Sequence, residues 1–383
     1  MTEIPYGRQS IIESDIEAVS QALRATRITQ GPIVEDFEQA VSDYVGSKHA
    51  IACNSATSGL YLAYRAMGVK EGSLVWTVTN TFVATSNAAL LCGADVDFID
   101  IDSETWNISL EQLATKLRNR KEQGRQLPDV VTVVHFAGLP CDLMEIWNLS
   151  QTYGFMVLED ASHALGASYH NSKIGDCRFS HAAVFSFHPV KMITTGEGGM
   201  VTTNDEGIAE KCKELRSHGV TRDSNKFRSP SIGDWYFEQH ELGMNLRITD
   251  IQCALGLSQL TRIDRFVEKR RSLAKNYISS LSGKDFDHQR EDSDRTSSYH
   301  LFVIKTKNQD RDELINKLNY QGIVCSVHYI PVPFHPFYQD MGFKSSAYPE
   351  SEHYFETAFT IPLFFDLEQS EQEKIIKHLS ELV

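Results

Sequence analysis

The chain has 383 residues, 41% hydrophobic and 23% charged, a globular composition that excludes a disordered or collagen-like chain. Its net charge of −14 makes it a poor candidate for binding nucleic acid or an anionic membrane surface. No apolar run approaches the ~18 residues of a membrane span, and the first residues lack the basic and apolar segments of a signal peptide. At about 100–200 residues per domain, this length predicts two or three domains.

The seven cysteines are odd in number and include no CxxC pair. This pattern argues against a disulfide framework and against a zinc module, and no metal site is expected. It is typical of a reducing compartment, so we predict a cytoplasmic protein whose cysteines are small core residues.

The first 45 residues read as two helices separated by a turn. Ser14 is placed to cap the first helix, in which Ile16, Val19 and Leu23 follow at helical spacing. Thr29–Pro32 forms the turn. The second helix has an apolar stripe that recurs every three or four positions: Val34, Phe37, Val41, Tyr44 and Val45.

From about residue 50 to residue 203, short apolar runs alternate with helix-length segments. The expected strands are His49–Cys53, Leu74–Thr77, Val96–Ile99, Val130–His135, Phe155–Glu159, Ala182–Ser186 and Met200–Thr202. The expected helices include Ser58–Met67, Leu110–Arg120 and Leu143–Thr152. Such alternation predicts an α/β fold with a mostly parallel central sheet, whose ligands bind at the carboxyl ends of the strands.

The last third of the chain has a different pattern. Helices are expected over 205–217 and 249–280, with a polar loop at Arg222–Gly243 between them. Strands at Tyr299–Lys305 and Val324–Tyr329, with helices at Asp312–Tyr320 and Gln369–Leu382, predict a smaller α+β unit. We therefore divide the chain into a large domain of residues 1–250 and a small domain of residues 251–383.

Lys191 is the first candidate for chemistry. It follows the strand that ends at Ser186 and precedes the glycine-rich Gly196–Gly199. A lysine placed between an apolar strand and such a loop has restricted access to water, which lowers its pKa and makes the amine nucleophilic. A structural lysine remains the alternative.

The second candidate is the pair Glu159–Asp160, which follows an apolar run, with His163 three residues on. A carboxylate at the end of a buried strand is costly unless it meets a cation. A protonated pyridine nitrogen is one such partner, and His163 could hydrogen-bond another atom of the same ring. A helix N-cap by Asp160 is the alternative.

Two further segments follow expected strands. Asn54–Gly59 has small hydroxyl residues at the start of a helix, which suits a phosphate but also an ordinary N-cap. Asn80–Thr85 carries Phe82, which could stack on a flat ring or belong to the core. Together the four segments supply what a pyridoxal phosphate site needs: a phosphate holder, a ring clamp, a carboxylate and a lysine.

The whole chain resembles the DegT/DnrJ/EryC1/StrS aminotransferases, fold-type-I pyridoxal phosphate enzymes that aminate nucleotide-linked keto-sugars. The resemblance rests on NSATS at 54–58, TFVAT at 81–85, EDASHALG at 159–166, FSFHPVK at 185–191, GEGG at 196–199 and GMNLRITD at 243–250. It implies a large domain with a mostly parallel sheet and a smaller C-terminal domain. It also implies that Lys191 binds the cofactor covalently, Asp160 pairs with the ring nitrogen and Phe82 covers one ring face.

The resemblance assigns the remaining cofactor contacts by position. His163 stands where many relatives carry Gln, beside the phenolic oxygen of the ring. Ala56, Thr57 and Ser186 would hold the phosphate. Asn245 matches a residue that relatives contribute to the phosphate from the neighbouring subunit, which implies a homodimer with shared active sites.

Within the family, SFHPVKMITTGEGGMV at 186–201 and RSHG at 216–219 are most similar to the branch of the pseudaminic acid pathway. This implies transamination of a UDP-linked 4-keto-6-deoxy sugar with L-glutamate as donor. Another keto-sugar, dTDP-linked or 3-keto, is an open alternative, as is a non-catalytic regulator. The candidate substrate contacts are Tyr6, Arg27, His188, Arg247, His328 and Tyr329, the two arginines as cations for the diphosphate.

Overall fold

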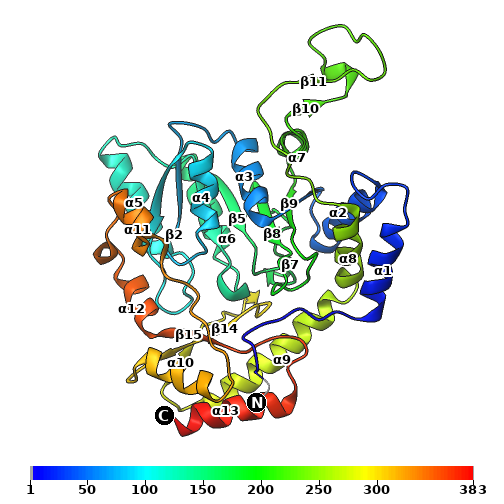
Figure 1. Ribbon diagram of the computed structural model, residues 1–383. Coiled ribbons are helices and arrows are strands. Elements are labelled where there is room, and N and C mark those ends of the chain that lie inside the picture. Colours follow the sequence, from blue (N-terminus) through cyan, green and yellow to red (C-terminus); the bar gives the residue numbers. More distant parts are fainter. Residues whose placement is uncertain (1–2, 383) are drawn as a thin grey trace.

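The computed structural model describes residues 3–382, and its centre is a seven-stranded sheet with the order β1-β9-β8-β5-β4-β2-β3 (Figure 1). Four neighbouring pairs are parallel, from β8 through β5, β4 and β2 to β3, whereas β9 runs antiparallel to both β1 and β8. The prediction of an α/β fold with a mostly parallel sheet is therefore confirmed. The strands are β1 His49–Cys53, β2 Leu74–Val78, β3 Asp95–Ile99, β4 Val130–Val134, β5 Met156–Asp160, β8 Ala182–Ser186 and β9 Gly199–Thr203.

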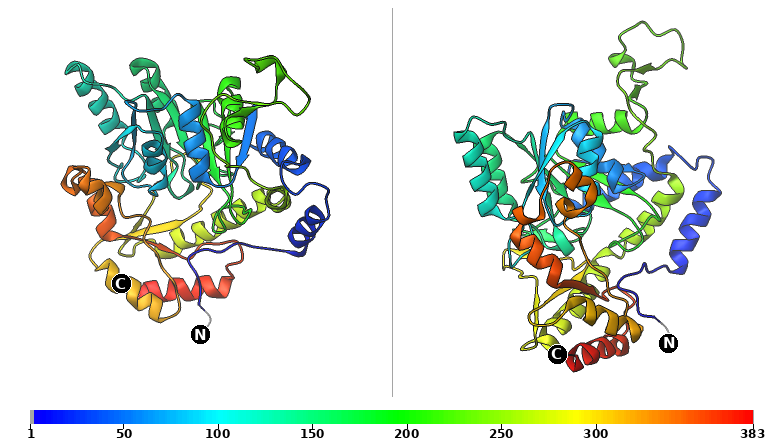
Figure 2. Two further views of the ribbon diagram at one scale, coloured as in Figure 1. Left: turned by 45° about the horizontal axis from the view of Figure 1, so that its top comes forward. Right: turned by 60° about the vertical axis from the view of Figure 1, so that its left-hand side comes forward.

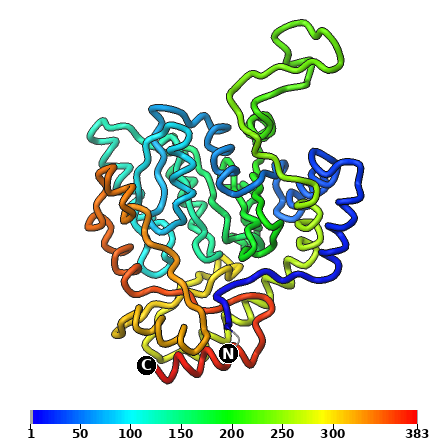
Figure 3. Tube along the Cα trace, viewed as in Figure 1, coloured from blue at the N-terminus to red at the C-terminus, as the bar shows by residue number. Residues whose placement is uncertain are grey.

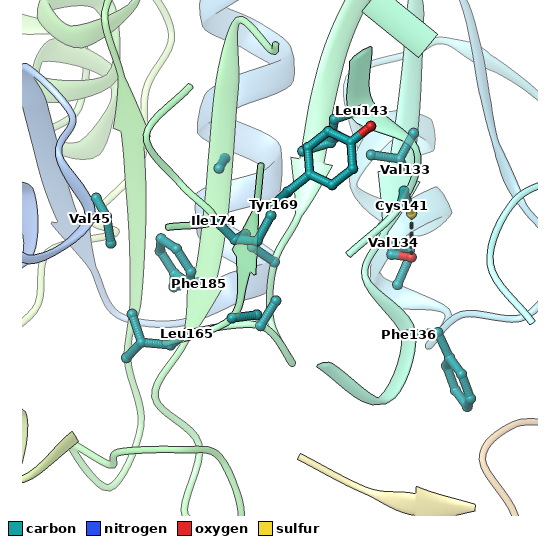
Figure 4. Close-up of a cluster of buried hydrophobic side chains, with 14 of the residues drawn as sticks. Val45, Val133, Val134, Phe136, Cys141, Leu143, Leu165, Tyr169, Ile174 and Phe185 are labelled. Atoms are coloured by element: carbon teal, nitrogen blue, oxygen red, sulfur yellow. Dashed lines mark hydrogen bonds between the residues drawn. The ribbon is translucent and has the colours of Figure 1, made fainter. Parts of the chain in front are cut away.

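Helices cover both faces of this sheet, since successive strand residues point to opposite sides. Val131 and Val157 face one core with α2 (Pro32–Val45), α5 (Leu110–Glu122) and α6 (Leu143–Tyr153). Val130 and Leu158 face the other core with α3 (Ala56–Ala66), α4 (Ala84–Leu91) and α7 (Glu206–Arg216). Part of the first core is drawn in Figure 4, where Phe185 and Ile174 approach one another.

A three-stranded antiparallel sheet of β12 (Phe286–His288), β14 (Phe302–Thr306) and β15 (Ala358–Ile361) forms a second unit with its own core. Helices α9 (Ile263–Leu281), α10 (Arg311–Tyr320) and α13 (Gln369–Glu381) bury their apolar stripes against it. Ile4 joins this core and pairs with Ile323, so the segment around Ile4 and the last helix, α13, both belong to the small unit (Figures 1 and 3).

The division at residue 250 stays a prediction. Helix α8 (Asp250–Leu260) packs against α1 (Glu13–Leu23) and α2 beside the large sheet, and α9 then leads into the small unit (Figure 2). The chain later returns to the large sheet through α11 (Pro336–Asp340) and α12 (Pro349–Thr357). There Asp100 accepts the backbone N–H groups of Glu350 and Ser351.

Three expectations about local structure are wrong. The helix expected over 249–280 is two helices, divided at residues 261 and 262. The strand expected at Val324–Tyr329 reduces to one bridge, between Ser326 and Thr360. Helix α1 begins after Ile12, and Asp15, not Ser14, accepts the free N–H of Ile12. The spacing of apolar residues alone cannot locate the ends of helices, because an interruption of two residues leaves that spacing almost unchanged.

The N-terminus of α2 is capped from a distance by Asp250, whose carboxylate accepts the N–H groups of Gly31 and Ile33. A Cβ at Gly31 would lie 2.5 Å from Asp250 Oδ1, so the close approach requires glycine. Asp250 therefore joins α8 to α2, which gives the last residue of the 243–250 run a structural role.

A segment that we call the arm, residues 222–242, projects from the body next to α7 (Figures 1 and 3). Its base is a two-residue pairing of β10 (Val220–Thr221) with β11 (Glu238–Gln239). The expected loop is thus largely confirmed, with a short hairpin added. Two more short pairings join β6 (Ser168–Tyr169) to β7 (Ser172–Lys173) and to β13 (Arg295–Thr296).

All seven cysteines are buried and unpaired, which confirms their prediction as core residues. Within residues 3–382, none of the helices has the length and apolar character needed to cross a membrane.

Candidate active site

The site lies at one edge of the large sheet, where the carboxyl ends of β1, β2, β5 and β8 meet. The amino end of β9 lies at the same edge because β9 runs antiparallel to β8. These ends surround a cavity of about 370 Å³, which we call the first cavity. It is lined by eleven of the predicted site residues: Tyr6, Ala56, Thr57, Phe82, Asp160, His163, Ser186, His188, Lys191, His328 and Tyr329.

Lys191 reaches the first cavity from the turn that follows β8. Burial lowers the pKa of its amine to about 8, against the opposing attraction of Asp160. A measurable fraction of the amine is therefore uncharged near neutral pH. Among the described residues, the polar contact of its Nζ is with Nε2 of His300, at 3.5 Å.

Asp160 ends β5 with its side chain facing the same cavity and is only 5% exposed. The Thr85 hydroxyl donates to its Oδ2 over 2.7 Å, and the Ser162 N–H donates to its Oδ1 over 3.2 Å. No helix begins between residues 161 and 167, so Asp160 is not a helix cap. The carboxylate is instead held by two donors at the wall of the first cavity.

His163 is buried beside Tyr329, and its tautomer follows from its partners. Its Nδ1 lies 3.3 Å from the Ala137 N–H and must accept, so Nε2 carries the proton. That proton is donated to the Tyr329 hydroxyl, 3.1 Å away. Burial, together with Lys191 and His328, holds the pKa of His163 well below its usual range, so the ring is neutral. The contact expected between His163 and the cofactor's phenolic oxygen stays a prediction.

The other end of the first cavity is built from the start of α3. Ser55 caps this helix by accepting the Ser58 N–H, and the helix opens with Ala56 and Thr57. Gly199 allows β9 to pass against this turn, since a Cβ there would lie 2.6 Å from the Ala56 nitrogen. Backbone N–H groups and the positive end of a helix dipole favour a phosphate dianion at this point.

Phe82 is 58% exposed, so it is not a core residue. It lines the first cavity, and its ring centroid lies 5.9 Å from that of Tyr329. An exposed ring over a cavity that holds a buried carboxylate and an amine is available to cover a flat ligand. The residues present therefore fit pyridoxal phosphate: a helix start for its phosphate, Phe82 for a face, Asp160 for the ring nitrogen and Lys191 for the aldehyde.

Three predicted residues lie outside the first cavity of their own chain. Arg27 is exposed beside Gly31. Asn245 is exposed at the foot of the arm, where it pairs with Ser217. Arg247 lines another cavity of about 460 Å³, between α2 and the end of α7, which we call the second cavity.

The sequence reasoning assigned no role to His300 or Thr85, although both contact predicted site residues. Thr85 could have been found from its place at the start of α4, in the segment that leads from β2 at the edge that carries Asp160. His300 lies far from the other site residues in the chain, and only the packing of the 298–301 segment against the large sheet brings it to Lys191.

This fold and this lysine–carboxylate arrangement define a fold-type-I enzyme that uses pyridoxal phosphate. Comparison with known proteins narrows the class. The chain belongs to the DegT/DnrJ/EryC1/StrS aminotransferase family, which it matches over residues 9–380. It is thus a pyridoxal phosphate-dependent sugar aminotransferase, and the resemblance noted in the sequence is confirmed.

Individual relatives support this placement. Two Campylobacter jejuni proteins named UDP-4-amino-4,6-dideoxy-N-acetyl-beta-L-altrosamine transaminase are 38% and 39% identical, over 88% of this chain and 86% of theirs. The solved structure of Helicobacter pylori PseC, an aminotransferase of pseudaminic acid biosynthesis, superposes with a TM-score of 0.90 at 30% identity over 99% of both chains. The PLP form of the putative sugar aminotransferase Spr1654 from Streptococcus pneumoniae gives 0.89 at 26% identity over 100% of both chains.

Proposed function

We propose that this enzyme transfers the amino group of L-glutamate to C4 of a UDP-linked 4-keto-6-deoxy sugar, in a pathway that makes pseudaminic acid. The observation that carries the proposal is the enclosed Lys191 amine facing the Asp160 carboxylate in the first cavity. The choice of sugar is supported by the Campylobacter transaminases and the Helicobacter pylori structure described above.

When bound, pyridoxal phosphate supplies an aldehyde and an electron-withdrawing ring that accept an amino group and later return it. Asp160 keeps the ring nitrogen protonated, and Thr85 and Ser162 hold that carboxylate in place. Lys191 takes the α-proton from glutamate and, in the second half of the reaction, delivers a proton to C4 of the sugar. An amine whose pKa is about 8 suits both transfers near neutral pH.

The test is a panel of UDP- and dTDP-linked keto-sugars, 4-keto and 3-keto, supplied with glutamate and read by mass spectrometry. We expect a 4-amino product from the UDP-linked 4-keto-6-deoxy sugar, and no product from the Lys191→Ala protein. If a dTDP-linked or a 3-keto sugar reacted faster than the UDP-linked 4-keto-6-deoxy sugar, that sugar would be the preferred substrate instead. If glutamate bleached the yellow protein but none of the sugars gave a product, only the first half-reaction would be supported, and the proposed sugar substrate would be wrong.

We further propose that Arg27 and Arg247 provide positive charge for the sugar diphosphate. Among the described residues that line the first cavity, Lys191 is the one side chain of lysine or arginine type, and it is committed to the cofactor. A diphosphate therefore needs cations from elsewhere. Arg27→Ala and Arg247→Ala should raise KM for the nucleotide sugar more than KM for glutamate. Equal changes in both constants would remove this idea.

A homodimer with shared active sites would bring such residues to the first cavity of the partner. Support comes from apolar side chains that one chain leaves exposed. On α1 they include Ile16 at 51% and Leu23 at 57%; on the arm, Ile232 at 70% and Trp235 at 66%. Exposed apolar residues on a projecting segment are typical of an interface. In the shared arrangement, Asn245 would contact the phosphate held by the other subunit.

Subunit mixing tests the sharing. Lys191→Ala and Asn245→Asp proteins, each nearly inactive alone, are unfolded together and refolded at equal amounts. With shared sites, a mixed dimer has one site that is intact in both residues, so activity recovers to about a quarter of wild type. If Asn245 serves its own chain, every site carries one lesion and no activity returns.

A further inference from the structure

His300 approaches Lys191 from the small unit rather than from the large sheet. It lies two residues before β14, lines the first cavity and is 3% exposed. Its Nε2 lies 3.5 Å from Lys191 Nζ. Among the described residues, this is the one polar contact of the ring, because Nδ1 is buried without a hydrogen-bond partner.

The backbone around His300 is fixed by an unusual set of contacts. The buried Arg270 donates from Nη1 to the His300 carbonyl over 3.0 Å. Ser298 donates its N–H to the Gly138 carbonyl and its hydroxyl to the His163 carbonyl. The segment is thus bound to the loop after β4 and to the residue that orients Tyr329.

Tyr299 adopts a left-handed conformation, with φ of 48°. For a residue with a large side chain this costs about 1–2 kcal/mol, so the surrounding contacts must impose it. The result is that consecutive side chains point in opposite directions: the Tyr299 hydroxyl donates to Glu291 over 2.6 Å, while His300 enters the first cavity. The backbone conformation therefore serves to aim the imidazole at Lys191.

The charges around the pair keep His300 neutral. Burial, and then Lys191, His163, Arg270 and His328, hold the pKa of His300 well below its usual range. The titratable groups that face the pair come from several elements: Asp160 of β5, His163 after it, His188 after β8, Glu197 before β9, Arg270 of α9, His328 and Tyr329, and Tyr6 near the N-terminus. Because the ring stays neutral, it can act on Lys191 through a hydrogen bond but not as a cation.

The direction of the hydrogen bond between His300 Nε2 and Lys191 Nζ follows from the other ring nitrogen, Nδ1, which has no partner among the described residues. A neutral imidazole carries one proton, and a buried N–H without a partner is rarer than a buried acceptor without one. The proton therefore belongs on Nε2, which donates to the lone pair of the uncharged amine, and the orphan Nδ1 is an acceptor.

We propose that His300 is a positioning residue that donates from Nε2 to the Lys191 amine and holds it oriented as the free base whenever the amine is not bonded to the cofactor. The proposal rests on Lys191 being the cofactor lysine. It assigns a function to the 298–301 segment. This segment of the small unit supplies the imidazole that orients the Lys191 amine, which comes from the large sheet.

Gln and Met provide a matched pair of substitutions, because their side chains have similar length and volume and differ in the amide. The measurement is competitive labelling of Lys191 in the cofactor-free protein with an amine-reactive reagent across pH, read by mass spectrometry. We expect H300Q to keep the midpoint of labelling near that of wild type. H300M should raise it by about one pH unit, which makes Lys191 about tenfold less reactive at pH 7.

A role in packing alone predicts the reverse order, because the more apolar Met further disfavours the ammonium form. Equal midpoints, or a lower midpoint in H300M, would overturn the proposal. A measurement on the cofactor-free wild type covers the case in which H300M does not fold. At about pH 9 to 10, where the Lys191 amine is mostly uncharged, NMR of the histidine rings should find His300 neutral with its proton on Nε2. A proton on Nδ1 at that pH overturns the idea.

Neither measurement requires cofactor or substrate. If borohydride instead fixed the cofactor to a different lysine, the proposed function would fail while the coupling between His300 and Lys191 would still be measured.

Discussion

The two cavities of the large sheet differ in what their charged groups do. The second cavity is the larger, about 460 Å³ against about 370 Å³, and holds more charged side chains. Near its centre, Glu38 and Arg216 form an ion pair. Both side chains also bind the backbone of Ala52: Glu38 accepts the Ala52 N–H, and Arg216 donates to the Ala52 carbonyl. These charges satisfy the open side of the edge strand β1, as an exposed edge requires.

In the first cavity the principal charges are kept apart. Asp160 is held by Thr85 and Ser162, and no ion pair joins it to Lys191 within the described residues. The cost of keeping a carboxylate and an amine enclosed without direct contact is recovered when a ligand fits between them. The comparison teaches that charge held in position without a counter-ion marks the candidate active site, whereas cavity size does not.

The largest expected effect is in the first cavity. Lys191→Ala should lower turnover by at least about a thousandfold, because among the described residues that line the first cavity no other lysine is placed to carry the proton. Borohydride treatment of the loaded wild type should attach the cofactor to the peptide that contains Lys191. Lys48→Ala, an exposed lysine of the second cavity, is the control and should leave turnover within about twofold. Retained transamination in the Lys191 variant would break the comparison.

The next effect concerns the carboxylate. Asp160→Asn preserves shape and the contact with Thr85 but removes the anion that stabilises a protonated ring nitrogen, so the first half-reaction should slow by about a hundredfold or more. Stopped-flow absorbance with glutamate measures that step directly. Circular dichroism should be unchanged. A variant that reacts at the wild-type rate would mean that Asp160 serves only the local turn.

The sequence predicted most of the large sheet because each strand is a short apolar run ended by turn residues, and β1 and β8 have the expected bounds. Asp160 is the last residue of β5, and Lys191 lies five residues after the neighbouring parallel strand β8, so strand order brings the two segments to the same edge of the sheet. What could not be predicted depends on contacts distant in the chain. Examples are the placement of His300, the donation from Thr85, and the use of Asp250 as a cap for α2.

Substitutions in the second cavity should change the free energy of unfolding rather than the turnover rate. Glu38→Gln removes the carboxylate that pairs with Arg216, leaving a half-buried guanidinium without its anion. We expect the free energy of unfolding to fall by about 2–3 kcal/mol, with turnover per folded molecule little changed. Thermal melting and urea titration measure the loss. Glu35→Gln is the matched control, since Glu35 is exposed in the same cavity and should change stability by no more than about 0.5 kcal/mol.

The smallest expected effect tests whether the buried charge of Lys191 lowers the free energy of unfolding of the cofactor-free protein. The pKa of Lys191 falls from 10.5 to about 8 on folding of the cofactor-free chain. Between these values the unfolded chain binds more protons, so wild-type stability should rise as pH rises from about 8 to 10.5.

Lys191→Met removes that titration. At pH 7 the cofactor-free variant should be more stable than cofactor-free wild type by about 1–2 kcal/mol, less than the full shift implies because the side chain keeps some exposure. The difference should shrink above pH 8 and vanish near pH 10.5, as measured by urea unfolding at a series of pH values. An advantage that is constant with pH would indicate better apolar packing instead of a relieved charge, and a variant less stable at pH 7 would mean that the amine is already satisfied in the empty site.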